Sequence, residues 1–318
     1  MRIALDVMGG DHAPQELIAG ALIWAETSNT ELLLVGQEER IVRELHNQLY
    51  DHAKISIVNA TQIMEMDEPV TALRKKQDSS IVVATRLVKE GKADAVVSCG
   101  STAAQMAAAT LILGRLEHIE RPPIVAVIPG MAGKIALLLD VGANVDCKPQ
   151  QLLQFALLGR VYAGILTGLD NPRVALLNNG EEEGKGNSQT VAAYQLLHEQ
   201  TDLNFIGNIE GRDLFLGKTD VVVCDGFVGN LLLKSMEGMA MFIGMACQKE
   251  LGKLPSVFQY FDYSRAGGAP LLGVNGVSIV CHGSSKREAV SNGIRIAEQC
   301  VNRQMVPSQI LALGAVRE

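Results

Sequence analysis

One lysine stands between two glycines in a loop that follows an apolar run. The segment reads RVALLNNGEEEGKGNS, residues 173–188, and sets Lys185 between Gly184 and Gly186. Glycine lets backbone N–H groups crowd toward an anion, and the lysine adds a full positive charge. The alternative is a solvated lysine that neutralises the three preceding glutamates, but the flanking glycines favour a backbone that passes close to a ligand. We therefore predict that Lys185 meets a small anion.

Glycine-rich turns with polar side chains follow other apolar runs as well. These turns read DVMGGDHAP, VSCGSTAAQ, LDVGANVD, CDGFVGN and CHGSSKRE. In open α/β sheets, ligands bind at the carboxyl ends of the strands, where a following helix N-terminus adds partial positive charge. One such turn is ordinary, whereas so many predict the rim of one binding site. The polar residues of this rim are Asp6, Asp11, His12, Ser101, Thr102, Asp140, Asn144, Lys185, Asp225, Asn230, His282, Ser284 and Ser285.

The common cofactor and hydrolase motifs are missing from these turns. The lysine loop departs from the Walker pattern, because Asn179 stands at its first glycine and Gly186 replaces Ser/Thr. There is no G-x-G-x-x-G turn, no G-x-S-x-G elbow and no H-E-x-x-H or clustered Cys/His set. The rim aspartates could hold Mg²⁺, but capping and turn stabilisation are favoured. We predict an anion site with no cofactor, no metal and no protein nucleophile.

Composition limits the class of protein. With 318 residues and 47% hydrophobic content, the chain can bury a large core. A net charge of −7 and only 4% aromatic residues argue against a nucleic-acid binder. The six cysteines form no C-x-x-C pair, which is typical of reduced thiols in the cytoplasm. The start, MRIALDVMGGD, does not have the pattern of a signal peptide, and no apolar stretch approaches the ~20 residues that span a bilayer.

Short apolar runs alternate with helical periodicity along the chain, which predicts a largely parallel sheet covered on both faces. Only Met131, Ala132 and Gly133 separate PIVAVIPG from KIALLLDVG. A crossover helix cannot fit there, so these two runs should pair antiparallel in a mixed sheet. Without linkers of low complexity, we expect residues 1–318 to form a single α/β unit, either undivided or with two lobes around a cleft.

Two further segments have alternative interpretations. Residues 70–92 carry Arg74, Lys75 and Lys76, which form either a solvated helical face or a dock for an acidic partner. Residues 231–261 are rich in methionine and phenylalanine. For such a helical segment, core packing or a dimer interface is favoured over contact with an acyl chain or a membrane surface.

Over essentially its whole length, the sequence resembles the bacterial phosphate acyltransferase family, the acyl-ACP:phosphate acyltransferases of phospholipid synthesis. The resemblance lies in ALDVMGGDHAP, ALRKKQDSS, LLLDVGANVDCKP, ALLNNGEEEGKGN, NIEGRDL, DVVVCDGFVGNLLLK, GAPLLGVNG and HGSS. It implies a three-layer α/β/α fold like that of phosphotransacetylases and isocitrate/isopropylmalate dehydrogenases, usually in a homodimer. One departure is CGSTAA where the family has AGNTGA, so that Ser101 replaces asparagine and Ala103 replaces glycine. Serine lacks the reach and second donor of the amide, which puts this loop's contribution to binding in question.

The resemblance also implies the reaction and its partners. Inorganic phosphate attacks the thioester of acyl carrier protein (ACP), and acyl phosphate and free ACP are released. The family is cytosolic or peripherally attached to the membrane, where a glycerol-3-phosphate acyltransferase consumes the product. Because phosphate is itself nucleophilic, the enzyme has only to hold it against the carbonyl and stabilise the oxyanion.

The resemblance and the residue chemistry together give the predicted site. Lys185 receives phosphate or the oxyanion, Asn230 donates to the carbonyl, and His12 binds phosphate or transfers a proton. Arg74, Lys75 and Lys76 would contact ACP. The residues predicted to bind substrate or phosphate are Gly9, Gly10, Asp11, Ser101, Thr102, Asn144, Gly184, Gly186, Asp225, Gly229, His282, Gly283, Ser284 and Ser285.

Three other functions compete with this one. A phosphotransacetylase that uses acyl-CoA would share the anion site. A decarboxylating dehydrogenase would share the fold, but the sequence shows neither its carboxylate cluster for a metal nor a nicotinamide site. A membrane-surface scaffold without enzymatic activity would act through residues 231–261.

Overall fold

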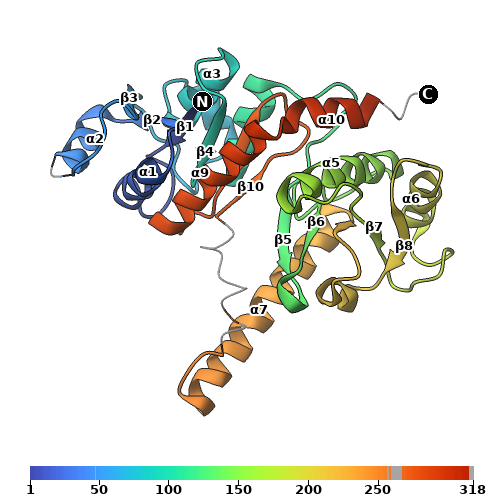
Figure 1. Ribbon diagram of the computed structural model, residues 1–318. Coiled ribbons are helices and arrows are strands. Elements are labelled where there is room, and N and C mark those ends of the chain that lie inside the picture. Colours follow the sequence, from blue (N-terminus) through green and yellow to red (C-terminus); the bar gives the residue numbers. More distant parts are fainter. Residues whose placement is uncertain (47, 256–257, 259–266, 315–318) are drawn as a thin grey trace. The chain divides into compact units, whose positions relative to one another are not determined.

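The strands form two sheets in the computed structural model, which describes residues 1–46, 48–255, 258 and 267–314 (Figure 1). The chain divides into two compact units, residues 1–116 with 263–306 and residues 117–262 with 307–318. The first unit contains a sheet in the order β10-β11-β4-β1-β2-β3, and the second contains one in the order β5-β6-β9-β7-β8. The predicted α/β class with mixed, mostly parallel pairing is confirmed.

Alternating strands and helices build the first unit around its sheet. All strand pairs there are parallel except β10 with β11. Its strands are β1 (Arg2–Asp6), β2 (Glu31–Gly36), β3 (Ile55–Asn59), β4 (Ala95–Ser98), β10 (Ala269–Pro270) and β11 (Val277–Val280). Its helices and helical turns are α1 (Gln15–Thr27), α2 (Glu38–Leu45), η1 (Val70–Arg74), α3 (Ser80–Lys89), α4 (Thr102–Ala108), η2 (Ala109–Leu113) and α9 (Arg287–Asn302).

The second unit begins with the hairpin that the short linker predicted. Val125 pairs with Leu139 and Pro129 with Ile135, so β5 and β6 are antiparallel, as expected. Its strands are β5 (Val125–Pro129), β6 (Ile135–Leu139), β7 (Val174–Leu177), β8 (Phe205–Ile209) and β9 (Val221–Val223). Its helices and helical turns are η3 (Met131–Gly133), α5 (Pro149–Thr167), α6 (Ser188–His198), η4 (Gly211–Leu216) and α7 (Gly226–Leu251), and α10 spans Met305–Gly314.

Each sheet buries apolar side chains under the helices that cover it. In the first unit, α3 and α4 pack on Ala4, Val35 and Val96 of the sheet. In the second unit, η4 and the first turns of α7 pack on the sheet around Leu138 and Val222. These layers hold the strand ends in place, and with them the turns that carry polar residues. No helix in the described part of the chain has both the length and the apolarity needed to cross a membrane.

Helix α7 covers most of the methionine-rich segment predicted at residues 231–261. It starts before that segment, at Gly226, where the Asp225 carboxylate caps the helix by accepting the Val228 N–H at 2.8 Å. It ends at Leu251 with Gly252 in the left-handed conformation. The later positions 256–257 and 259–261 of the predicted segment lie outside the described residues.

Candidate active site

Three loops of the first unit meet at the carboxyl edge of its sheet, because β1, β4 and β11 are adjacent and parallel. The Asp11 N–H donates to the Gly283 carbonyl at 2.9 Å. Gly10 has a φ of +107°, and a Cβ there would lie 2.9 Å from the carbonyl oxygens of Cys99 and Gly283. A Cβ on Gly9 would lie 2.9 Å from the backbone N and Cα of Gly100. Both glycines are therefore needed for the loops to pack together.

Asp6 lies buried beneath these loops. Its carboxylate is 2% exposed and accepts hydrogen bonds from the Ser98 hydroxyl at 2.7 Å and the Met8 N–H at 3.2 Å. The Ser98 hydroxyl in turn accepts the Gly100 N–H at 3.1 Å. Burial raises the pKa of the Asp6 carboxyl, and hydrogen bonds from Ser80 and Ser98 partly offset that rise. Asp6 thus stabilises the loops that follow β1 and β4 through these hydrogen bonds.

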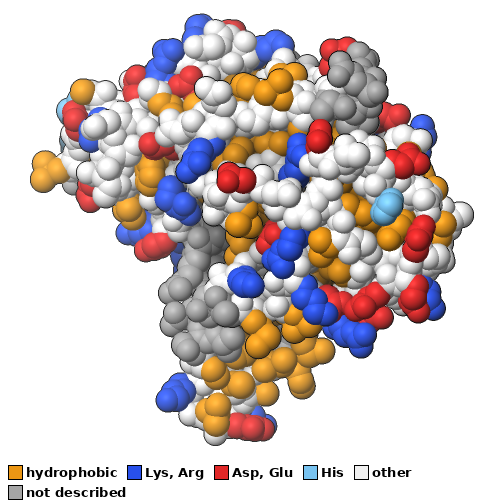
Figure 2. Space-filling view, turned by 45° about the vertical axis from the view of Figure 1, so that its right-hand side comes forward, with side chains coloured by type: hydrophobic (Ala, Val, Ile, Leu, Met, Phe, Trp, Pro, Cys, Tyr) orange, Lys and Arg blue, Asp and Glu red, His pale blue; other side chains and the backbone are white. Residues whose placement is uncertain are grey.

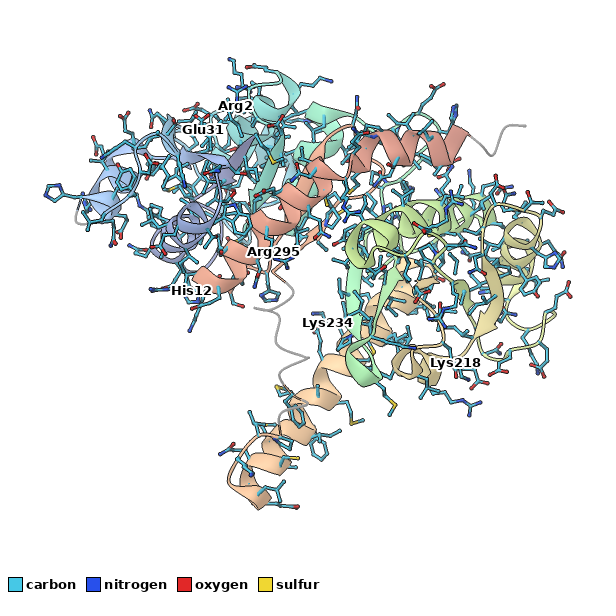
Figure 3. The ribbon with its side chains drawn as sticks, in the orientation of Figure 1. Arg2, His12, Glu31, Lys218, Lys234 and Arg295 are labelled. Atoms are coloured by element: carbon cyan, nitrogen blue, oxygen red, sulfur yellow. The ribbon has the colours of Figure 1, made fainter. Side chains whose placement is uncertain are left out.

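The polar side chains of this edge come from the starts of α1 and α9. His282 Nδ1 lies 2.8 Å from the Ser284 hydroxyl oxygen and accepts the Ser284 N–H at 3.2 Å. Ser284 is exposed, whereas Ser285 is buried. His12 lies half-buried just before α1, and its carbonyl accepts the Glu16 N–H (Figure 3). The predicted residues of the three loops are brought together in this unit.

The loop that departs from the family pattern caps α4. The Ser101 hydroxyl accepts the Ala104 N–H at 3.5 Å, which is the usual N-cap interaction of a serine. Thr102 and Ala103 are exposed beside it. Serine therefore serves as a cap at this position.

In the second unit, the loop after β6 lies against the start of α7. Asn144 is 2% exposed and donates both hydrogens of its amide, to Asp140 Oδ2 at 2.8 Å and to the Pro122 carbonyl at 3.2 Å. This amide holds the loop, so its hydrogens are not available to a substrate. Asn230, the fifth residue of α7, is exposed. A Cβ on Gly229 would collide with the Asp140 carbonyl, so glycine is needed for the helix to sit here.

The lysine loop follows β7 at the same sheet edge as the starts of α6 and α7. The Lys185 side chain is 49% exposed, and its Nζ lies 3.9 Å from Glu182 Oε1. Gly186 has a φ of +100°, and any Cβ there would collide with the Thr190 hydroxyl. Gly184 has open space around its Cα. The loop therefore presents one cation to solvent on a tightly constrained backbone.

Two asparagine side chains hold this loop by its carbonyls. Asn178 Nδ2 donates to the Lys185 carbonyl at 2.9 Å, and Asn208 Nδ2 donates to the Glu182 carbonyl at 2.8 Å. Glu183 Oε1 accepts from Gln195 Nε2 at 2.8 Å, which ties the loop to α6. Neither asparagine was among the predicted site residues. Asn178, in the pair Asn-Asn at a strand end, offered a signal, whereas Asn208 offered none.

The three basic residues predicted to contact a partner have different environments. Arg74 and Lys75 are exposed at the end of η1. Lys76 donates to the Ile63 carbonyl at 2.7 Å and pairs with Glu68 at 2.6 Å. Lys76 is therefore engaged within the first unit, and the exposed charges are those of Arg74 and Lys75.

The family model of fatty acid synthesis proteins matches residues 1–308. The chain belongs to this family. Its relatives include the phosphate acyltransferase of Syntrophomonas wolfei, which is 61% identical over 99% of both chains. The phosphate acyltransferase of Desulforamulus reducens is 52% identical over 97% of this chain and 96% of its own.

Solved structures of other enzymes share the fold of this family member. A phosphotransacetylase from Streptococcus pyogenes superimposes with a TM-score of 0.65 at 18% identity, over 96% of this chain and 94% of its own. The EutD phosphotransacetylase from Staphylococcus aureus gives 0.60 at 17% identity over 94% of each. At such identities the likeness shows the fold alone. The predicted likeness to the phosphotransacetylase fold is thereby confirmed.

Proposed function

We propose that this chain transfers a fatty acyl group from acyl-ACP to inorganic phosphate, giving acyl phosphate for phospholipid synthesis. The observation that carries the proposal is Lys185, a half-exposed cation on a loop anchored by its carbonyls. Relatives named phosphate acyltransferase support phosphate as the acceptor of the acyl group, because they are 61% and 52% identical over 99% and 97% of this chain.

The chemistry needs no nucleophile from the protein. A phosphate oxygen attacks the thioester carbonyl carbon, the C–S bond breaks, and the thiol of the carrier leaves with a proton. Lys185 would bind the phosphate dianion, and Asn230 near the start of α7 would donate an N–H to the oxyanion. The donors of the first unit, His12, Ser284 and Ser285, are proposed to bind substrate.

The same proposal covers partners and location. The exposed Arg74 and Lys75 suit an acidic carrier protein, and phosphates of CoA would suit them as well. The apolar helix α7 supports a homodimer or a peripheral membrane contact. A glycerol-3-phosphate acyltransferase would consume the reactive product. The free cysteines, five of them buried, suit the cytoplasm.

Acyl phosphate formation, trapped with hydroxylamine, tests this function. Wild type, Lys185→Ala and Lys253→Ala are compared with long-chain acyl-ACP and acyl-CoA as parallel donors; Lys253 is an exposed lysine of the same unit and serves as the matched control. We expect product from acyl-ACP, a loss of about 10²–10³-fold in Lys185→Ala, and no loss in the control. Product only from acyl-CoA would make the chain a phosphotransacetylase, and product from neither donor would favour the scaffold.

A further inference from the structure

Asp140, which directly follows β6, accepts more hydrogen bonds than any other carboxylate of the second unit among the described residues. Its side chain is fully buried. Oδ1 accepts the backbone N–H groups of Ile124 at 2.9 Å, Gly142 at 3.3 Å and Ala143 at 3.2 Å. Oδ2 accepts the backbone N–H of Asn144 at 2.6 Å and its side-chain amide at 2.8 Å. The whole turn from Gly142 to Asn144 is therefore wrapped around one carboxylate.

The first turn of α7 sits directly on this wrapped turn. The Gly226 N–H donates to the Asn144 carbonyl at 2.7 Å. A Cβ on Gly226 would lie 2.9 Å from Asp140 Oδ2, and one on Gly229 would collide with the Asp140 carbonyl oxygen. The two glycines remove the side chains that would hold the helix away. The position of the helix start is thus set by the Asp140 turn.

Asn230 is the side chain that this contact positions. A Cβ added to Gly142, whose φ is +135°, would lie 3.6 Å from Asn230 Cγ and 3.7 Å from its Oδ1. Asn230 therefore packs over the bare Cα of Gly142, and the residue as a whole remains exposed. The N–H of Gly142 is one of those that Asp140 holds.

We propose that Asp140 is a positioning residue for acyl transfer, which aims the Asn230 amide by fixing the turn on which Asn230 rests. This inference rests on the proposed function, in which Asn230 donates to the oxyanion. A donor that stabilises a transition state must be held in place before the charge develops. In Asp140→Asn, an NH₂ group would replace one acceptor among N–H donors, and the turn would move.

A double-mutant cycle tests whether Asp140 acts through Asn230. It combines Asp140→Asn with Asn230→Ala and measures kcat and KM for phosphate, at a temperature where every variant is folded. We expect Asn230→Ala to lower kcat about 10²–10³-fold and Asp140→Asn about 10–10²-fold, with KM for phosphate changed less than about twofold. The double variant should lie within about threefold of Asn230→Ala, since the second change acts on an amide already removed.

Asp213→Asn is the matched control. Asp213 is also a buried aspartate of the second unit, 2% exposed, and its partners are the Glu210 N–H and Lys218. Its effect on kcat should be small and should multiply with that of Asn230→Ala. If the effects of Asp140→Asn and Asn230→Ala multiplied in the same way, Asp140 would only support the fold and the inference would be overturned.

Gly142→Ala repeats the test if Asp140→Asn does not fold. The φ of +135° at Gly142 is disfavoured for alanine, so the substitution shifts the turn beneath Asn230. It should give the same drop in kcat without adding to Asn230→Ala; multiplying effects would again overturn the inference. Acyl phosphate from the wild type together with multiplying effects refutes the inference alone. No product from the wild type with either donor refutes the proposed function and this inference with it.

Discussion

At the scale of single residues, the buried side-chain amide of Asn208 holds the loop that carries Lys185. It is 5% exposed, its Nδ2 holds the Glu182 carbonyl, and its Oδ1 has no hydrogen-bond partner. Among the described residues, the hydrogen bond that this buried amide makes is therefore with the loop that carries Lys185. The second amide, from Asn178, binds the Lys185 carbonyl itself.

Asn208→Ala should loosen the loop without removing its cation. We expect KM for phosphate to rise about tenfold, kcat to change less than about threefold, and the free energy of unfolding to fall by about 1 kcal/mol. Asn204→Ala is the control, because Asn204 directly precedes β8, the strand that contains Asn208. It donates to the carbonyl of Asn171, which lies before β7, whereas the lysine loop follows β7. Steady-state kinetics in phosphate checks this; an equal rise of KM in both variants would contradict it.

Residue types and spacing drew attention to the lysine loop, but not to the side chains that hold it. Lys185 was predicted because glycines flank it, and its side chain is 49% exposed. A Cβ at Gly186 would collide with the Thr190 hydroxyl, whereas one at Gly184 would meet nothing, so packing within the protein accounts for Gly186. The binding of an anion by Lys185 stays a prediction. Asn144 was predicted to bind substrate, yet its amide serves Asp140 and Pro122. An asparagine in a turn has the same pattern whether its amide faces a ligand or the backbone, so only the fold distinguishes the two.

At the scale of elements, an ion pair ties α1 to the start of α9. The backbone N–H and the Nε of Arg287 each lie 3.0 Å from Glu16 Oε2, and Nη2 contacts Oε1. These hydrogen bonds lower the pKa of the Glu16 carboxyl from 4.5 to about 2. A lowered pKa in the folded state stabilises the protein above the unfolded pKa, and this stabilisation is lost as pH falls through the folded pKa.

Glu16→Gln should therefore destabilise the protein at neutral pH and much less in acid. Because both side chains are partly exposed, at 21% and 49%, we expect only about 1 kcal/mol near pH 7. The gap between the unfolding temperatures of the two proteins should shrink from pH 4.5 toward pH 2. Thermal unfolding followed by circular dichroism over this range measures the gap, and a gap that is independent of pH would refute the assignment to this ion pair.

The order of elements was predictable, but their division between two sheets was not. The five residues between β5 and β6, 130–134, leave no room for a crossover helix, so the antiparallel pair followed from length alone. Alternation of strands and helices is the same whether the strands join one sheet or two. The start of α7 at Gly226 was not predictable either, because glycine has a low helix propensity. The contact of Gly226 and Gly229 with the Asp140 turn, which explains these glycines, is a feature of the fold.

At the scale of the whole molecule, the two units use the same device. Strands β1 and β6 both lead into Leu-Asp-Val, and in each case the aspartate is buried and accepts N–H or O–H groups of the loops around it. In each unit a glycine lets the backbone lie against the aspartate: Gly9 against Asp6, and Gly226 against Asp140. In both units, a buried carboxylate organises the turns that the sequence marked as candidate binding loops.

Helix α7 leaves a large apolar surface on the second unit. Within α7, all of whose residues are described, only Gly226, Gly229 and Gly244 are buried. Met239, Met241, Phe242 and Met245 are 58–64% exposed, and Figure 2 shows hydrophobic side chains gathered on this part of the molecule. Contiguous apolar surface of this kind marks an interface with another protein or a membrane.

If a second copy of the chain covers this face, the protein is a dimer, and negative charges introduced into the apolar surface of α7 should separate its subunits. Wild type should sediment at twice the chain mass of 34.1 kDa, and Phe242→Glu combined with Met245→Glu should sediment as a monomer at about 10 μM. Lys249→Glu changes the net charge by the same two units on the same helix and should remain a dimer, because it replaces no apolar contact. A dimer that survives the double change would place the interface elsewhere. A monomeric wild type that binds anionic vesicles through these side chains would assign the face to the membrane instead.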